Sequence, residues 1–366
     1  MDASTPSPSN PQVVVSAQPV PAYVVPQQPP RRSWFARLLV ALLLMALFGS
    51  IMLNLILLAL MGFSGQDADA RVQEKHFSHT RHAPNKIAIF SIEGTILSGE
   101  GFFKRQIDHA RREIEDGRLK AIVLRINSPG GTVVGSDYML HHLRELRKET
   151  GVPIVVSMGG VAASGGYYVA MAVGDTPRTI FAEPSTWTGS IGVVIPHYNL
   201  AELFDKVGVA EDSITSHRLK RMGTLSRPMT DEEIAIFQAL VDDGFTQFKD
   251  VIKQGRPKFR DDPDALERLA TGQVFTAEQA KRAGLVDEIG FVEAAVDRAI
   301  ELAGVDADNV EVVSYKAEAG LLDLLLGSSA ARSQPAWDLA ALLDLSAPRA
   351  YYLWTNLPPL AASRSQ

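Results

Sequence analysis

Ser164 is the first candidate for a reactive group, because small residues surround it where a strand is expected to turn into a helix. The run Ala162–Tyr168 reads AASGGYY and follows an apolar segment. A serine at a helix start faces the positive end of the helix and has open space above its hydroxyl. That setting suits a nucleophile, and a serine that only caps the helix is common at the same position. The spacing is not the G-x-S-x-G elbow of α/β-hydrolases, because three residues separate Gly160 from Ser164.

A second turn offers a place for the negative charge that a nucleophilic attack creates. The run Ser128-Pro129-Gly130-Gly131 ends an apolar strand. Glycine lets the backbone approach a ligand closely, and amides at a helix start bind anions. The turn therefore suits an oxyanion hole with Gly130 as a donor, and a tight turn without any ligand explains the pattern equally well.

A serine nucleophile needs a general base, and the chain offers histidine or lysine for that role. Only His197 and His217 follow Ser164, and neither has an acidic residue evidently placed to orient it. A lysine serves when its pKa falls from about 10.4 to roughly 7–8, which costs on the order of 4 kcal/mol and requires a dry, uncharged setting. Lys220 lies between arginines in a loop ahead of a long helix, and by sequence alone an exposed basic loop is the plainer interpretation.

These turns need a framework, and the hydrophobic pattern predicts one in which strands alternate with helices. Such alternation favours βαβ units around a mostly parallel, buried sheet, so the expected fold class is α/β. Thr230, with Glu233 three positions later, predicts a capping box at the start of the last helix. The expected strands are 86–92, 121–127, 153–158, 178–182 and 190–196, and the expected helices are 103–115, 136–149, 167–173 and 230–253.

The front of the chain carries an apolar segment with the length of a membrane span. No charged residue occurs from Leu38 to Phe63. A helix of that length measures about 39 Å, which exceeds the roughly 30 Å of a hydrocarbon core. Arginines precede the segment and aspartates follow it, so we expect a single-pass anchor in the cytoplasmic membrane, with a cytoplasmic N-terminus and the rest of the chain outside. A cleaved signal peptide is the alternative, because Ala68-Asp69-Ala70 has the form of a cleavage site, but the apolar run is too long for one.

The segments around this anchor define the expected domain organisation. Residues 1–37 are rich in proline and should form a disordered cytoplasmic arm. Residues 64–84 should form a polar stalk, and residues 85–316 a globular domain. The tail, residues 317–366, mixes apolar clusters with proline and serine, so we expect it either to pack on a neighbouring subunit or to return to the membrane.

The composition excludes several classes of function. The net charge of −6 over 366 residues gives no support to nucleic-acid binding. The absence of cysteine excludes disulfides, a cysteine nucleophile and thiolate metal sites. Three histidines at three-residue spacing, His76, His79 and His82, could hold a metal, but a solvated linker explains them more simply. We therefore expect no metal and no cofactor.

Five short motifs occur in a characteristic order: LRINSPGG at 124–131, AASGGYY at 162–168, TGSIGV at 188–193, SRPMT at 226–230 and GLVDEIG at 284–290. Each motif is weak alone, but the set is specific. Together with the N-terminal apolar segment, it resembles the bacterial signal peptide peptidase SppA family in its short single-domain form. The resemblance covers roughly residues 86–315.

The resemblance implies a Clp-protease/crotonase-like fold of repeated βαβ units and a serine peptidase with a Ser–Lys dyad. It assigns Ser164 as the nucleophile, Lys220 as the general base and Gly130 as an oxyanion-hole donor. Ser190 matches the serine whose hydroxyl holds the lysine amine, which needs an oriented acceptor. The family also implies a ring-like homo-oligomer in which serine and lysine meet across subunits.

The expected function is that of a membrane-anchored serine endopeptidase, which degrades cleaved signal peptides and similar apolar peptides through an acyl-enzyme. Its expected partners are peptide substrates, the membrane and further copies of the chain, without nucleic acid. One alternative is a catalytically silent membrane scaffold of the same fold. Another is a crotonase-type acyl-CoA enzyme with Gly130 at a thioester enolate, but that hypothesis leaves Ser164 and the outward topology unexplained.

Overall fold

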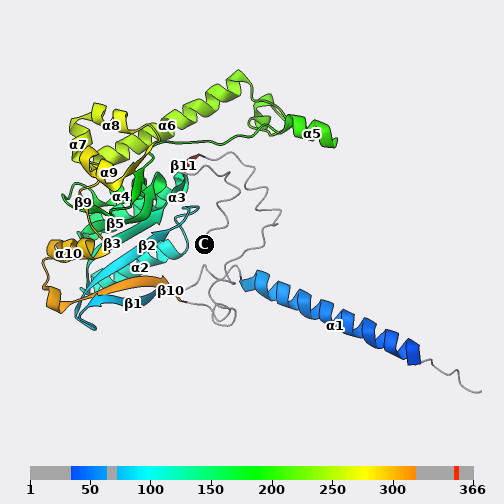
Figure 1. The fold of residues 1–366 in the computed structure, drawn as a ribbon, viewed down its shortest axis with the longest axis horizontal. Helices are drawn as coiled ribbons and strands as arrows, with labels where there is room; N and C mark the ends of the chain where they lie inside the picture. The colour runs from blue at the N-terminus through cyan, green and yellow to red at the C-terminus, as the bar shows by residue number, and fades with distance from the viewer. Residues whose placement is uncertain (1–33, 64–71, 319–349, 354–366) are drawn as a thin grey trace, which may run out of the picture. The chain divides into compact units, whose positions relative to one another are not determined.

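The computed structural model describes residues 34–63, 72–318 and 350–353 (Figure 1). The chain divides into two compact units at Met61–Gly62. The first unit holds most of helix α1 (Trp34–Phe63), which contains the apolar segment predicted above. Within the described residues, no helix has both the length and the apolar character that crossing a membrane requires. Residues 1–33 of the proline-rich N-terminal segment and most of the C-terminal tail lie outside the described residues. Residues 34–37, expected in the same disordered segment, belong to α1.

The second unit is built on a nine-stranded sheet, in the order β1-β10-β2-β3-β5-β6-β9, with β7 beside β5 and β8 beside β7 (Figure 1). The strands from β10 to β9 in this order are parallel to their neighbours, whereas β1 is an antiparallel edge strand. The sheet strands are β1 (Val72–His79), β2 (Asn85–Glu93), β3 (Leu119–Ser128), β5 (Ile154–Ala163), β6 (Ile180–Ala182), β7 (Trp187–Gly189), β8 (Val274–Thr276), β9 (Glu288–Ile289) and β10 (Val310–Ala317).

Both faces of the sheet are apolar, because alternate residues of each central strand point to opposite sides. Ala88 and Phe90 of β2 belong to a core that includes residues of the helices α2, α3, α4 and α6. Ile87 and Ile89 belong to a second core with α10. This layered arrangement confirms the α/β class. The helices are α2 (Phe102–Glu115), α3 (Val133–Thr150), α4 (Gly165–Ala170), α5 (Ala201–Val207), α6 (Asp231–Gly255), α7 (Pro257–Asp261), α8 (Pro263–Leu269), α9 (Ala277–Ala283) and α10 (Val292–Ala303).

Residues 197–240, which we call the arm, lead away from the sheet. The arm contains α5, the 3₁₀ helix η3 (Arg218–Arg221) and the first part of α6, and α5 lies beyond the N-terminal end of α6 (Figure 1). The predicted capping box at the start of α6 is confirmed: the Thr230 amide donates to Glu233 Oε2 at 3.0 Å, and the Glu233 amide donates to Thr230 Oγ1 at 3.3 Å. Several large apolar side chains of the arm are exposed, namely Leu203, Val207, Val209, Ile214, Ile234 and Leu240.

Two sequence expectations differ from the structure. Residues 72–79, expected in a polar stalk, form strand β1, because their alternating pattern pairs antiparallel with β10 and Glu74 bonds Lys86. The strand expected over 190–196 is wrong: β7 ends at Gly189, and only Val194 forms an isolated bridge. The reason is local, because Gly189 and Ser190 both have positive φ angles, 84° and 51°, which interrupt an extended chain.

Candidate active site

Ser164 joins β5 to α4 in a strained backbone conformation. Its φ of 53° and ψ of −115° are sparsely populated for a residue with a side chain and cost of order 1–3 kcal/mol. The surroundings impose this conformation, because the Ser164 amide donates to the Gly189 carbonyl and its own carbonyl accepts from the Tyr168 amide, both at 2.8 Å. Its hydroxyl makes no capping hydrogen bond to α4. Ser164 therefore does not cap α4 with its side chain, and its hydroxyl lies at a buried turn.

The glycine turn predicted from the sequence lies directly against Ser164. Gly130 begins β4 (Gly130–Thr132) with a φ of 99°, which favours glycine. A Cβ atom on Gly130 would lie 3.1 Å from Ser164 Cβ and 2.6 Å from the Gly165 amide nitrogen, and it would collide with the carbonyl oxygen of Tyr352. A side chain at position 130 would thus fill the space above the serine.

Gly165 is a further candidate for the oxyanion hole that sequence reasoning missed. As the first residue of α4, it has no carbonyl one turn earlier in the helix to accept its N–H. In nucleophile elbows the amide after the serine supplies one donor, and the double glycine after Ser164 was the signal for it. The Gly130 amide donates to Ser128 Oγ at 3.1 Å, so Gly165 is the better placed of the two amides in this state.

Ser190 directly follows β7, the strand that pairs with β5 next to Ser164. Strand β7 pairs in parallel with β5, Ala163 opposite Gly189, so Ser164 and Ser190 each follow a paired residue at the same end of the two strands. Ser190 is buried, and its amide donates to the Gln273 carbonyl at 2.7 Å. Strand pairing thereby places Ser190 near Ser164, and Gly130 lies against Ser164, although the three residues are far apart in the sequence.

Lys220 is not part of this cluster in the described chain. It lies in η3 on the arm, its side chain is exposed, and no contact with Ser164 or Ser190 is present among the described residues. The flanking arginines are engaged elsewhere: Arg218 pairs with Glu232, and Arg221 pairs with Glu211. The described part of one chain therefore does not supply the dry setting that a neutral lysine requires.

The two histidines considered as bases are engaged by backbone groups of the arm. Nε2 of His197 lies 3.2 Å from the Thr224 carbonyl oxygen. Nδ1 of His217 accepts from the Leu219 amide at 3.3 Å. Neither ring is bonded to Ser164 in the described structure.

The carboxylate of Glu211, which precedes Lys220 in the chain, binds two residues that follow it. Glu211 Oε2 accepts from the hydroxyls of Thr224, at 2.6 Å, and of Ser226. Hydrogen bonds from Ser226 and Thr224 hold the pKa of Glu211 well below its usual range. Next to it, Arg227 holds the carboxylate of Glu233, so the SRPMT motif fastens the loop to the start of α6.

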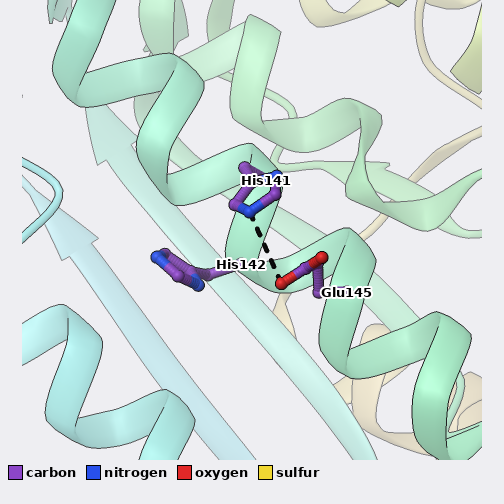
Figure 2. Close-up of side chains that lie close together, drawn as sticks. All are labelled: His141, His142 and Glu145. Carbon is purple, nitrogen blue, oxygen red and sulfur yellow. Dashed lines mark ion pairs between the residues drawn. The ribbon is translucent and has the colours of Figure 1, made fainter.

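Two groups of side chains have the composition of a metal site within the described residues. In the first, Glu74 and Glu113 both accept from the Lys86 ammonium, at 2.6 and 2.9 Å, so a cation already neutralises them. The second group, His141, His142 and Glu145, lies on α3 (Figure 2), and Nε2 of His141 lies 3.4 Å from Oε2 of Glu145. Neither group belongs to the turns that carry Ser164.

The buried, strained Ser164 turn is compatible with a hydrolase of the serine type, and comparisons with known proteins identify its family. The model of Peptidase family S49 matches residues 146–306, which include Ser164, Ser190 and Lys220. A putative protease of Synechocystis sp. is 37% identical over 242 residues, which cover 66% of this chain and 83% of that protein. The chain belongs to peptidase family S49, the signal peptide peptidase SppA family, and is a serine peptidase.

Longer relatives match over part of their length. Protease 4 of Haemophilus influenzae is 34% identical over 226 residues, which cover 60% of this chain and 35% of that protein. The chain thus spans about a third of the length of that relative. Among solved structures, a membrane-bound stomatin-specific protease, a mutant in complex with a substrate peptide, aligns with a TM-score of 0.41 and 19% identity, over 67% of this chain and 98% of that chain.

Proposed function

We propose that this serine peptidase is a membrane-anchored endopeptidase that cleaves remnant signal peptides and similar apolar peptides with a Ser164–Lys220 dyad. The observation that carries the proposal is the strained Ser164, whose hydroxyl is not used for capping and which faces the backbone of Gly130. We further propose that the α/β fold is of the Clp-protease/crotonase type. The crotonase-type acyl-CoA alternative gives Ser164 no role.

The proposed reaction proceeds through an acyl-enzyme. The Ser164 Oγ atom attacks the peptide carbonyl carbon while its proton passes to the neutral amine of Lys220. The amides of Gly130 and Gly165 stabilise the oxyanion, and the intermediate collapses as Lys220 returns the proton to the leaving amine. Water then attacks the ester, with Lys220 as base again. The Ser190 hydroxyl oxygen accepts a hydrogen bond from the amine of Lys220 and thereby orients the nitrogen lone pair toward Ser164.

We propose that Lys220 reaches Ser164 from a neighbouring copy in a ring-like homo-oligomer. Three observations support this: Lys220 is exposed, it has no contact with Ser164 in the described chain, and the arm around it exposes apolar side chains such as Leu203 and Ile214. Contiguous exposed apolar surface is typical of protein–protein contact. Burial of the arm would also supply the dry setting that the lysine requires.

We propose that residues 38–63 anchor the enzyme in the cytoplasmic membrane, with the N-terminus in the cytoplasm and the peptidase domain outside. The uncharged run and its basic N-terminal flank support this orientation. The signal-peptide alternative predicts a mature chain that begins near Ala70. Mass spectrometry of the N-terminus from membrane fractions separates the two.

Covalent labelling tests the dyad directly. A fluorophosphonate probe should acylate the oligomer at Ser164, as mapped by mass spectrometry, and Ser164→Ala or Lys220→Ala should abolish peptide hydrolysis. Lys206→Ala is the matched control, because Lys206 is another exposed lysine of the arm and should leave hydrolysis unchanged. An unlabelled Ser164 in an intact oligomer would favour the silent scaffold. That alternative is also compatible with an exposed Lys220.

A further inference from the structure

The middle of α3 carries the sequence His141-His142-Leu143-Arg144-Glu145. In a helix, residues three and four positions apart are neighbours on one face. Glu145 is therefore a neighbour of His142, three positions earlier, and of His141, four positions earlier. Helices that bind metal ions use these same spacings, in pairs of histidines four apart and in Glu-x-x-His pairs. The segment thus has the residue types and the spacing of a three-ligand metal site.

The ligand atoms of these three side chains lie close together. Figure 2 shows His141 and Glu145 directed toward one another, with Nε2 of His141 3.4 Å from Oε2 of Glu145. Two ligands of one tetrahedral zinc ion lie about 3.4 Å apart, because their bonds to zinc measure about 2.0–2.2 Å. The ligand atom of His142 lies within 4.8 Å of both others. It needs to approach them by about 1.4 Å at most, and the broad χ2 torsion of histidine allows such an adjustment.

The surroundings orient the three ligands without covering them. Leu143 of the same helix is buried in the core, which fixes the face that α3 turns to solvent. The ring of Tyr138 lies edge-on to that of His142, with 4.3 Å between the ring centroids. His141 and Glu145 are exposed, so an ion can reach them and water can complete its coordination.

The charges around this group are compatible with a bound cation. Lys104 of α2 acts electrostatically on His142, but Asp108 pairs with Lys104 and offsets its charge. The carboxylate of the α3 group adds a further negative charge. The other group of possible ligands, around Glu74, differs because the ammonium of Lys86 already binds its two carboxylates. Of the two groups in the described residues, the one on α3 is therefore the better metal site.

We propose that His141, His142 and Glu145 bind a divalent transition-metal ion of the zinc type, and that this ion links successive turns of α3 on its solvent-facing side. Imidazole nitrogens with one carboxylate oxygen suit zinc, nickel and copper, whereas magnesium and calcium prefer oxygen ligands. Water fills the remaining coordination positions. The role of the ion is structural, because none of its ligands belongs to the turns that carry Ser164. The inference goes beyond the proposed function and does not depend on it.

Zinc binding to the full, untagged chain in detergent tests the site. Zinc chloride is titrated by calorimetry into the unchanged chain and into His141→Ala, His142→Phe and Glu145→Gln. Phenylalanine at position 142 keeps an aromatic ring against Tyr138 but offers no ligand. Each variant should bind zinc at least about tenfold more weakly, because even changes next to a metal ligand cost about 10–100-fold in affinity. Excess magnesium chloride should leave zinc binding unchanged.

Two controls separate metal ligation from a simple ion pair. Glu145→His removes the carboxylate but keeps a ligand four positions after His141, so it should bind zinc at least as tightly as the unchanged chain. His76→Gln removes a histidine that pairs with Glu311 at 3.0 Å, and should leave zinc affinity unchanged. Thermal unfolding without metal shows whether each variant folds. Zinc should raise the melting temperature of the unchanged chain more than that of His142→Phe.

Equal zinc affinity in the unchanged chain and the three ligand variants would overturn the inference, as would the absence of saturable binding. A loss of affinity in Glu145→His as large as that in Glu145→Gln would assign the carboxylate to an ion pair and also reject the site. Competition by magnesium would reject imidazole ligation. None of these measurements uses peptide hydrolysis, so a failure of Ser164 labelling would reject the peptidase mechanism and leave the metal site standing.

Discussion

The turn that carries Ser164 and the arm that carries Lys220 are built in opposite ways. Ser164 is 1% exposed, strained, and fixed by the pairing of β5 with β7 and by its contact with Gly130. Lys220 lies on an exposed 3₁₀ turn, fastened through Glu211 and without a contact to the serine in the described chain. Strand pairing thus holds the proposed nucleophile in place, whereas the proposed base has no contact with Ser164 in the described chain and needs another surface to cover the arm.

Removal of either residue of the proposed dyad should cause the largest loss of activity. Ser164→Ala and Lys220→Ala should each lower kcat/KM by about 10³-fold or more, because either loss stops acylation. If serine and lysine meet across subunits, mixing the two inactive variants as dissociated subunits and reassembling them should restore a substantial part of the activity. If one chain supplies both residues, the mixture should stay inactive. Measuring peptide hydrolysis before and after mixing distinguishes the two arrangements.

A glycine substitution sharpens the rigid half of the comparison. Gly130→Ala should lower kcat by about 10²–10³-fold, because its Cβ would fill the oxyanion position and φ is 99°. Gly117→Ala is the matched control: its φ of 71° is also positive, but nothing lies within 4 Å of the added Cβ. It should cost about 1 kcal/mol of stability with kcat unchanged. Equal kinetic losses in both variants would show that backbone strain alone matters.

Loosening the arm should have a smaller effect. Glu211→Gln weakens the hydrogen bonds from Thr224 and Ser226 and the ion pair with Arg221, so kcat/KM should fall about tenfold while fluorophosphonate labelling of Ser164 slows in parallel. Ser213→Ala, which removes one peripheral bond to the same carboxylate, should have little effect. A Glu211→Gln enzyme with normal kinetics would contradict a positioning role for this loop.

The smallest effect concerns pH. A hydrogen bond from Arg227 lowers the pKa of Glu233 from 4.5 to about 2. Because the folded-state pKa is depressed, the stabilisation of the α6 cap is fully present above about pH 4.5 and is lost as the pH falls toward 2. Glu233→Gln should therefore lower stability by about 1 kcal/mol at neutral pH and progressively less toward pH 2. Thermal unfolding against pH checks this, with the exposed neighbour Glu232→Gln as control.

Local sequence patterns correctly predicted those features that depend on only a few neighbouring residues. The turn at Ser164, the glycine turn at Gly130 and the capping box at Thr230 depend on a few neighbouring residues, and the structure contains all three. The α/β class followed from apolar runs that the sheet buries on both faces. The strand expected over 190–196 was wrong, because the apolar residues there are compatible with an extended chain but the positive φ angles of Gly189 and Ser190 interrupt it.

Long-range pairing decided the rest. The sequence alone determined that Ser164 and Gly130 lie in turns suited to chemistry, because residue type and turn chemistry are properties of short segments. Lys220 was indicated by the order of the motifs and not by its local setting. Only the tertiary structure decided that β1 joins the sheet, that Ser190 follows the strand paired with that of Ser164, and that residues 351–353 of the tail pair with β4. Main-chain hydrogen bonds between distant segments set these neighbours, and no local pattern records which strand lies next to which.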